Sequence, residues 1–293
     1  MLAPIAVFAF NRTDNISRML DSLSKCVLSK DSNVYLFIDG PRNQNDKEKC
    51  IKVKKIAENF ECKFRKLSIY SKDVNAGLAS SLISGISTLF DKYDRVIVLE
   101  DDLIFTDNFL VYMNSSLAFY QSEPKVGSIS GFSTPIDKKS NVDVYCHPRP
   151  CSWGWGTWKD RWKSCDWEYS PKNYIDRLKL RKISRKAGQD VYRMYQHQLT
   201  GKINSWAIRW TIHHLRNNLS VIYPYKSKVK NVGFGDDATH CKGRNPFPTN
   251  LDKSGNKDFL FLSDIEYDVK SISMVNYYHS NLYKLRFKLG LNK

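Results

Sequence analysis

The chain has 293 residues, of which 42% are hydrophobic and 13% aromatic, so it can bury a large core, and intrinsic disorder is not expected. Its net charge of +16 favours partners that carry negative charge, namely nucleic acid, anionic lipid or phosphorylated molecules, without choosing among them. No apolar run is long enough for a transmembrane helix, and the first residues lack the basic region of a signal peptide. Seven scattered cysteines without a CxxC pair favour a reducing cytosol over a disulfide framework.

The first part of the chain alternates short apolar runs with helical patterns. The expected strands cover residues 5–10, 34–38, 64–70 and 95–99. The expected helices cover residues 14–28, 46–60, 79–90 and 109–120. Strands and helices that alternate with short links predict an α/β fold, with a mostly parallel sheet flanked by helices.

The pattern changes after about residue 131. Three tryptophans occur in the glycine-broken segment 151–158, a basic helix is expected at 177–193, and another helix at 204–215. A strand at 221–225 and a polar loop at 231–240 follow. We see no repeat and no linker. The simplest organisation is one domain over residues 1–241, with halves 1–130 and 131–241, and a basic, helical C-terminal extension over 242–293.

The triplet Glu100-Asp101-Asp102 closes the expected strand at 95–99. Burying unpaired carboxylates costs several kcal/mol, so a divalent cation that carries a phosphorylated ligand is one explanation. The alternative is a strand that ends in solvated acids. Arg12 and Asp39 follow two other strands, and the carboxyl ends of parallel strands share the edge where ligands bind in open α/β sheets. Their position favours a ligand site.

Five segments in this order resemble a known family. They are Phe10-Asn11-Arg12, Asp39, Asn75-Ala76-Gly77-Leu78, Leu99-Glu100-Asp101-Asp102 and Ser152-Trp153-Gly154-Trp155. The set resembles GT-A glycosyltransferases over about residues 3–241. Within that fold it is most similar to the N-acetylglucosaminyltransferase I-like family and to related bacterial polysaccharide glycosyltransferases. The resemblance implies a GT-A, Rossmann-like sheet, with a nucleotide-sugar-binding half followed by an acceptor-binding half.

The resemblance also implies an activity: inverting transfer of a hexosyl or N-acetylhexosaminyl group from a UDP-sugar to a saccharide acceptor. The pathway would be surface polysaccharide or glycoconjugate biosynthesis. The implied cofactor is Mn²⁺ (or Mg²⁺), which Asp102 would contact where the metal bridges the diphosphate. The residues implied in donor binding are Asn11, Arg12, Asp39, Asn75, Gly77, Glu100, Asp101, Thr239 and His240.

The chain departs from the family where the catalytic base is expected. In the family an aspartate precedes a tryptophan, whereas the matching segment here is Ile203-Asn204-Ser205-Trp206, without a carboxylate. We therefore expect Asp236 or Asp237, in a glycine-rich loop, to act as general base. Aromatic faces suit sugar rings, so an acceptor-binding wall is expected, with core packing as the alternative. The residues expected to form it are Trp153, Trp155 and Trp206.

Aromatic and leucine residues alternate with Lys and Arg in the tail at 283–289, and 177–193 is also basic. A solvated surface is one interpretation. The other is peripheral association with the anionic inner face of the cell membrane by a cytoplasmic protein, which would suit a lipid-linked acceptor.

Two other functions compete with sugar transfer. A nucleotidyltransferase of NDP-sugar synthesis usually has a glycine-rich phosphate loop near its first strand, and residues 10–14 contain no glycine. A nucleic-acid-binding protein would explain the +16 charge, but the basic residues form no recognisable motif, so no nucleic-acid partner is expected.

Overall fold

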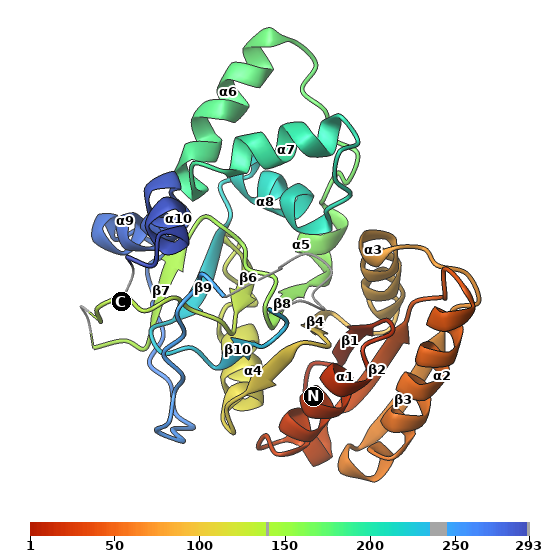
Figure 1. The fold of residues 1–293 in the computed structure, drawn as a ribbon. Helices are drawn as coiled ribbons and strands as arrows, with labels where there is room; N and C mark the ends of the chain where they lie inside the picture. Colours follow the sequence, from red (N-terminus) through yellow and green to blue (C-terminus); the bar gives the residue numbers. More distant parts are fainter. Residues whose placement is uncertain (139–140, 235–244, 292–293) are drawn as a thin grey trace.

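The computed structural model describes residues 1–138, 141–234 and 245–291, and its centre is an eight-stranded sheet (Figure 1). The strand order is β3-β2-β1-β4-β8-β6-β9-β7. Four strands at one end of this order are mutually parallel: β1 (Ile5–Ala9), β2 (Asn33–Ile38), β3 (Lys66–Ser71) and β4 (Arg95–Glu100). The predicted α/β class, with a mostly parallel sheet flanked by helices, is confirmed, as are the four strands predicted in the first 100 residues.

The other half of the sheet mixes directions. It contains β6 (Val126–Ser130), β7 (Val144–His147), β8 (Trp155–Trp158) and β9 (Ser220–Pro224). β8 is antiparallel to both β4 and β6, β6 and β9 are parallel, and β7 is antiparallel to β9. Of these strands only β9 was predicted from the sequence.

Helices cover both faces of the sheet because alternate residues of each strand point to opposite faces. Ile5 and Val7 of β1 belong to the core under α1 (Thr13–Ser24), α2 (Gln44–Glu58) and α4 (Phe109–Phe119). Ala6 and Phe8 belong to the core under α3 (Leu78–Leu89) and α8 (Trp206–Arg216).

The predicted basic helix at 177–193 is wrong as a single element. The structure has α6 (Tyr174–Ser184), a short 3₁₀ turn (Arg185–Ala187) and then α7 (Val191–Leu199). Gly188 adopts φ +130°, which favours glycine, and the helix therefore ends before it. A small helix, α5 (Lys159–Lys163), follows β8.

Gly156, which lies between the tryptophans Trp155 and Trp158, is required by internal packing. A Cβ at Gly156 would lie 2.9 Å from the backbone oxygen of Val96 on the adjacent strand. Glycine here lets β8 pack against α4, whose Met113 and Leu117 lie close to the same position. The segment that contains the tryptophans is therefore partly an interior strand.

A second, two-stranded sheet joins β5 (Leu103–Phe105) and β10 (Val229–Asn231) in antiparallel register, with Leu103 opposite Asn231. The C-terminal part ends in two helices, α9 (Val269–Tyr278) and α10 (Asn281–Lys288). The segment before them packs on α4, where Asp252 accepts a hydrogen bond from Asn108 Nδ2 at 2.9 Å and pairs with Lys228. In the described residues no helix is both long and apolar enough to span a bilayer.

Candidate functional site

The acidic triplet and Arg12 meet at the carboxyl edge of the parallel strands. β1 and β4 are neighbours, and Phe8 lies opposite Glu100. Arg12 follows β1 and forms an ion pair with Asp101, while its Nη1 donates to Asp102 Oδ2 at 3.2 Å. The sequence predicted this juxtaposition from the shared edge.

We call Glu100, Asp101 and Asp102 the carboxylate cluster. Arg12 is the cation that these three carboxylates share, and two of them have raised pKa values. Burial, reinforced by the charges of Asp102 and Asp101, raises the pKa of Glu100 to about 8. Burial also raises the pKa of Asp101 to about 6, although Arg12 opposes the shift. Both shifts express the cost of holding negative charges together at a partly buried site, so the cluster favours an additional cation.

Asn231 and Gly233 complete the surroundings of Asp102, and the sequence analysis missed both. Asn231 Nδ2 donates to Asp102 Oδ1 at 3.3 Å, and its own Oδ1 accepts from Gly233 N at 2.8 Å. A Cβ at Gly233 would lie 2.2 Å from Asp102 Oδ2, so the chain passes directly over the carboxylate. The pairing of β10 with β5 brings these residues to Asp102. No local sequence pattern predicts this pairing.

Asp39, Asn75 and Gly77 also come together, but they bind one another. The Asp39 carboxylate accepts from Asn75 Nδ2 at 3.1 Å and from the backbone nitrogens of Gly40, Ala76 and Gly77 at 2.9 to 3.0 Å. Four donors fill the lone-pair directions of one carboxylate. In this structure Asp39 holds the loop that starts α3, where Gly77 has φ +76°.

Asn11 is likewise engaged within the protein. Its Nδ2 donates to Asp46 Oδ1 on α2 at 2.6 Å, and Arg42 donates to the same carboxylate at 2.7 Å. The buried Asp46 had no part in the sequence analysis. It fixes the segment that leads to Arg12, so Asn11 acts here as a positioning residue.

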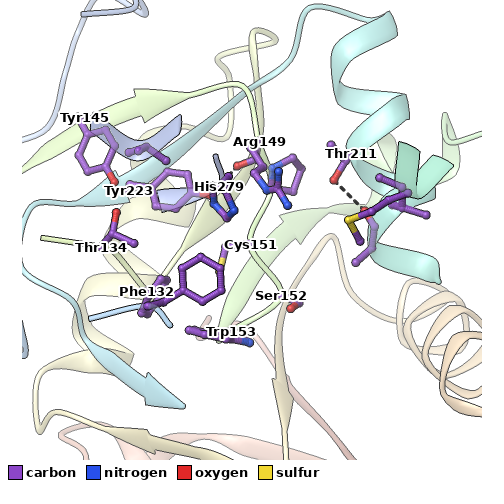
Figure 2. Close-up of a pocket in the computed structure, with 16 residues that line it drawn as sticks. Phe132, Thr134, Tyr145, Arg149, Cys151, Ser152, Trp153, Thr211, Tyr223 and His279 are labelled. Atoms are coloured by element: carbon purple, nitrogen blue, oxygen red, sulfur yellow. Dashed lines mark hydrogen bonds between the residues drawn. The ribbon is translucent and has the colours of Figure 1, made fainter. Parts of the chain in front are cut away.

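A pocket of about 210 Å³ is lined by residues that come after β6 in the chain (Figure 2). Cys151, Ser152 and Trp153 form one wall, on the segment that leads into β8. Phe234, which follows Gly233, packs on the Trp153 ring with centroids 5.8 Å apart and links the pocket to the loop over Asp102. The C-terminal part supplies a further set of lining residues, which sequence reasoning did not assign: Phe247, Val275 and His279.

Trp155 and Trp206 do not line this pocket. Both pack in the core, which was the alternative to an acceptor contact. Their side chains are 1% and 4% exposed, and the two rings stack 5.1 Å apart. Trp162 and Trp210 pack around them. Of the three tryptophans expected at the acceptor, only Trp153 lines the pocket.

The titratable groups of the pocket are uncharged apart from one ion pair. Burial, with Arg149 nearby, holds the pKa of His279 well below its usual value, so the ring is neutral. Burial raises the pKa of the Cys151 thiol to about 11. Arg149 is neutralised by Asp190, with Nη1 to Oδ1 at 2.8 Å. Aromatic walls with a few polar groups suit a neutral, hydroxyl-bearing ring.

Four predicted site residues lie outside the described residues: Asp236, Asp237, Thr239 and His240. Their roles as general base and in donor binding stay predictions.

A scan against protein-family models finds no match. No curated protein sequence matches the chain either. Among solved structures, the mannosyltransferase PcManGT from Pyrobaculum calidifontis, in complex with GDP-Man and Mn²⁺, is 12% identical with a TM-score of 0.41. That match covers 74% of this chain and 70% of the other.

Structures of S. aureus TarS resemble this chain with similar identities and TM-scores. One is 13% identical with a TM-score of 0.44 and covers 76% of this chain and 36% of that one. Another, of TarS residues 1–349 in complex with UDP-GlcNAc, is 13% identical with a TM-score of 0.41, covering 76% and 58%. The chain therefore spans about a third of the longer TarS structure and less than two thirds of the shorter one.

Proposed function

We propose that this protein is a glycosyltransferase that moves a hexosyl or N-acetylhexosaminyl group from a UDP-sugar to a saccharide acceptor, with inversion, in surface polysaccharide or glycoconjugate biosynthesis. The observation that carries the proposal is the carboxylate cluster, held by Arg12 at the carboxyl edge of parallel strands and linked to an aromatic pocket through the contact of Phe234 with Trp153. The two halves of the reaction need these two environments. A leaving diphosphate requires positive charge, and an acceptor sugar requires a wall on which its ring can pack.

The donor set fits Mn²⁺ or Mg²⁺, with Asp102 as the proposed ligand. Carboxylate oxygens are ligands that hard cations prefer. Within residues 1–138, 141–234 and 245–291, no group of three or more His, Cys, Asp or Glu side chains is arranged to hold a metal alone. Sites that bind a metal with one or two carboxylates take their remaining ligands from substrate phosphates. Such a cation, when bound, stabilises negative charge on the leaving diphosphate.

Titration of UDP into the protein by calorimetry, with Mn²⁺ and then with chelator, tests the donor side. We expect UDP to bind at least about tenfold more tightly with Mn²⁺, because the diphosphate otherwise meets a net negative cluster. Equal affinity after chelation would overturn the metal assignment. No binding in either condition would overturn the UDP-sugar proposal.

Replacement of Trp153 by alanine tests the acceptor side. We expect kcat/KM for the acceptor to fall by about tenfold or more, since an aromatic face against a ring is worth about 1 kcal/mol beyond its buried area. Hydrolysis of the UDP-sugar in the absence of acceptor should fall less, because Trp153 reaches the carboxylate cluster only indirectly, through Phe234. Trp153→Phe is the matched control and should retain most of the activity. An equal loss of donor hydrolysis and of transfer would contradict the assignment.

A further inference from the structure

The helix α10 carries a row of exposed leucines. Leu282, Leu285 and Leu289 are between 55% and 63% exposed. Spacings of three and four residues place the three leucines on one face of the helix. Leu289 is the residue that directly follows α10. On another face Tyr283 is buried and packs on Tyr277 and Tyr278 of α9. A contiguous apolar row on an otherwise polar surface indicates an interaction site.

The leucine row is bordered by positive charge. Arg286 and Lys288 lie on α10 itself, and the C-terminal end of α6 comes next to it (Figure 1). Three contacts fix this proximity: Asn276 Nδ2 donates to Lys186 O at 3.1 Å, Asn281 N donates to Gln189 Oε1 at 3.3 Å, and Lys284 pairs with Asp190 at 3.1 Å. The exposed basic residues at this end of α6 are Arg181, Lys182, Arg185 and Lys186.

These cations are not neutralised within the described part of the chain. None of the six (Arg181, Lys182, Arg185, Lys186, Arg286 and Lys288) has a carboxylate within 4.0 Å there. Lys284, by contrast, is paired with Asp190 and belongs to the interior side of α10. We call the leucine row together with these six cations the α6–α10 surface.

We propose that the α6–α10 surface docks on an anionic lipid bilayer. An apolar row flanked by Lys and Arg is the pattern of a helix that lies in the membrane interface. The leucines would enter the boundary between headgroups and acyl chains, and the cations would contact anionic headgroups. A second copy of the chain is a poorer occupant, because its own unpaired cations would repel those of the first copy.

Docking at this surface would also place the pocket beside the bilayer. α9 packs on α10 and supplies Val275 to the pocket, and His279 lies between the two helices. A lipid-linked saccharide is then the class of acceptor that fits this arrangement. This consequence rests on the proposed function, whereas membrane docking itself does not.

Co-sedimentation of the full chain with phosphatidylcholine vesicles, with and without phosphatidylglycerol, tests the docking. We expect binding only to the anionic vesicles, and expect it to weaken as salt is raised. The triple variant Leu282→Ser/Leu285→Ser/Leu289→Ser should reduce the partition coefficient by about tenfold or more. Because each cation near such a surface contributes about fivefold, Arg181→Gln/Arg185→Gln/Arg286→Gln should reduce it by about a hundredfold.

The matched control removes three charges elsewhere. Lys47, Lys49 and Lys52 are exposed on α2, at the opposite side of the view in Figure 1, and their triple replacement by Gln should leave binding within about twofold. Equal losses in the two charge variants would overturn the proposal, as would unchanged binding of the leucine variant or no binding of the wild type. A concentration-dependent dimer that the leucine variant abolishes, without vesicle binding, would assign the surface to self-association instead. No donor or acceptor is present in this assay, so its outcome is independent of the proposed sugar transfer.

Discussion

Replacement of Asp102 by asparagine is expected to lower kcat for sugar transfer by about a thousandfold. The side chain keeps its shape, and its remaining amide oxygen can still accept from Arg12 or from Asn231, although not from both. The negative charge that holds the proposed cation is removed. Initial rates with the UDP-sugar that shows the fastest donor hydrolysis measure the effect. The midpoint of thermal unfolding should change by no more than a few degrees, because no cavity is created.

A nearby acidic residue provides the control for this variant. Asp107 is exposed and lies outside the cluster, so Asp107→Asn should retain kcat within about twofold. Full activity of Asp102→Asn in the presence of chelator would show that neither Asp102 nor a metal serves the leaving group.

The largest expected loss of stability comes from Lys228→Met. Lys228 and Asp252 form an ion pair with side chains 5% and 3% exposed, and removal of one partner leaves a buried charge uncompensated. Asp252 keeps hydrogen bonds from Asn108 Nδ2 and Ser254 N, at 2.9 Å each, so we expect a loss of about 3 kcal/mol in the free energy of unfolding. Urea unfolding monitored by tryptophan fluorescence measures it.

The sign of the pH dependence follows from the Asp252 pKa. Burial opposes ionisation, but the hydrogen bonds from Lys228, Ser254 and Asn108 hold the pKa well below its ordinary value of 3.8. This carboxylate therefore stabilises the wild type above pH about 4, and the contribution is lost as pH falls. Without Lys228 the folded-state pKa rises, so the difference between variant and wild type should shrink in acid.

Two further variants separate the buried charge from other effects. Lys230 is exposed on β10, two residues after Lys228, and Lys230→Met should change the free energy of unfolding by about 0.5 kcal/mol or less. Lys228→Met/Asp252→Asn removes both charges, keeps an acceptor oxygen for Asn108 and should recover part of the loss. If Lys228→Met is no more destabilising than Lys230→Met, the ion pair does not contribute as described.

The first 100 residues could be interpreted from sequence because their strands are continuous apolar runs followed by polar residues. The rule that parallel strand ends share an edge then placed Arg12 beside Asp101 and Asp102. The same rule could not show that Asp39 is occupied by its own loop, since an Asp-Gly-Pro turn and a ligand site have the same local sequence.

The second half resisted prediction because its elements are defined by distant partners. β5, β7, β8 and β10 are only three or four residues long, too short for periodicity to identify. Trp155 is buried because α8, about 50 residues later, brings Trp206 and Trp210 onto it. No local pattern distinguishes such a tryptophan from Trp153, whose ring reaches the pocket.

The carboxylate cluster and the C-terminal part of the pocket lining come from different regions of the chain. Arg12, Asp101 and Asp102 come from the first 102 residues, whereas Phe247, Val275 and His279 come from the segment after residue 244. Exchange of that segment between related proteins would therefore alter which molecule fits the pocket and leave the carboxylate cluster intact. If the proposed function holds, the choice of acceptor can change with one end of the sequence while the donor site at the other end is kept.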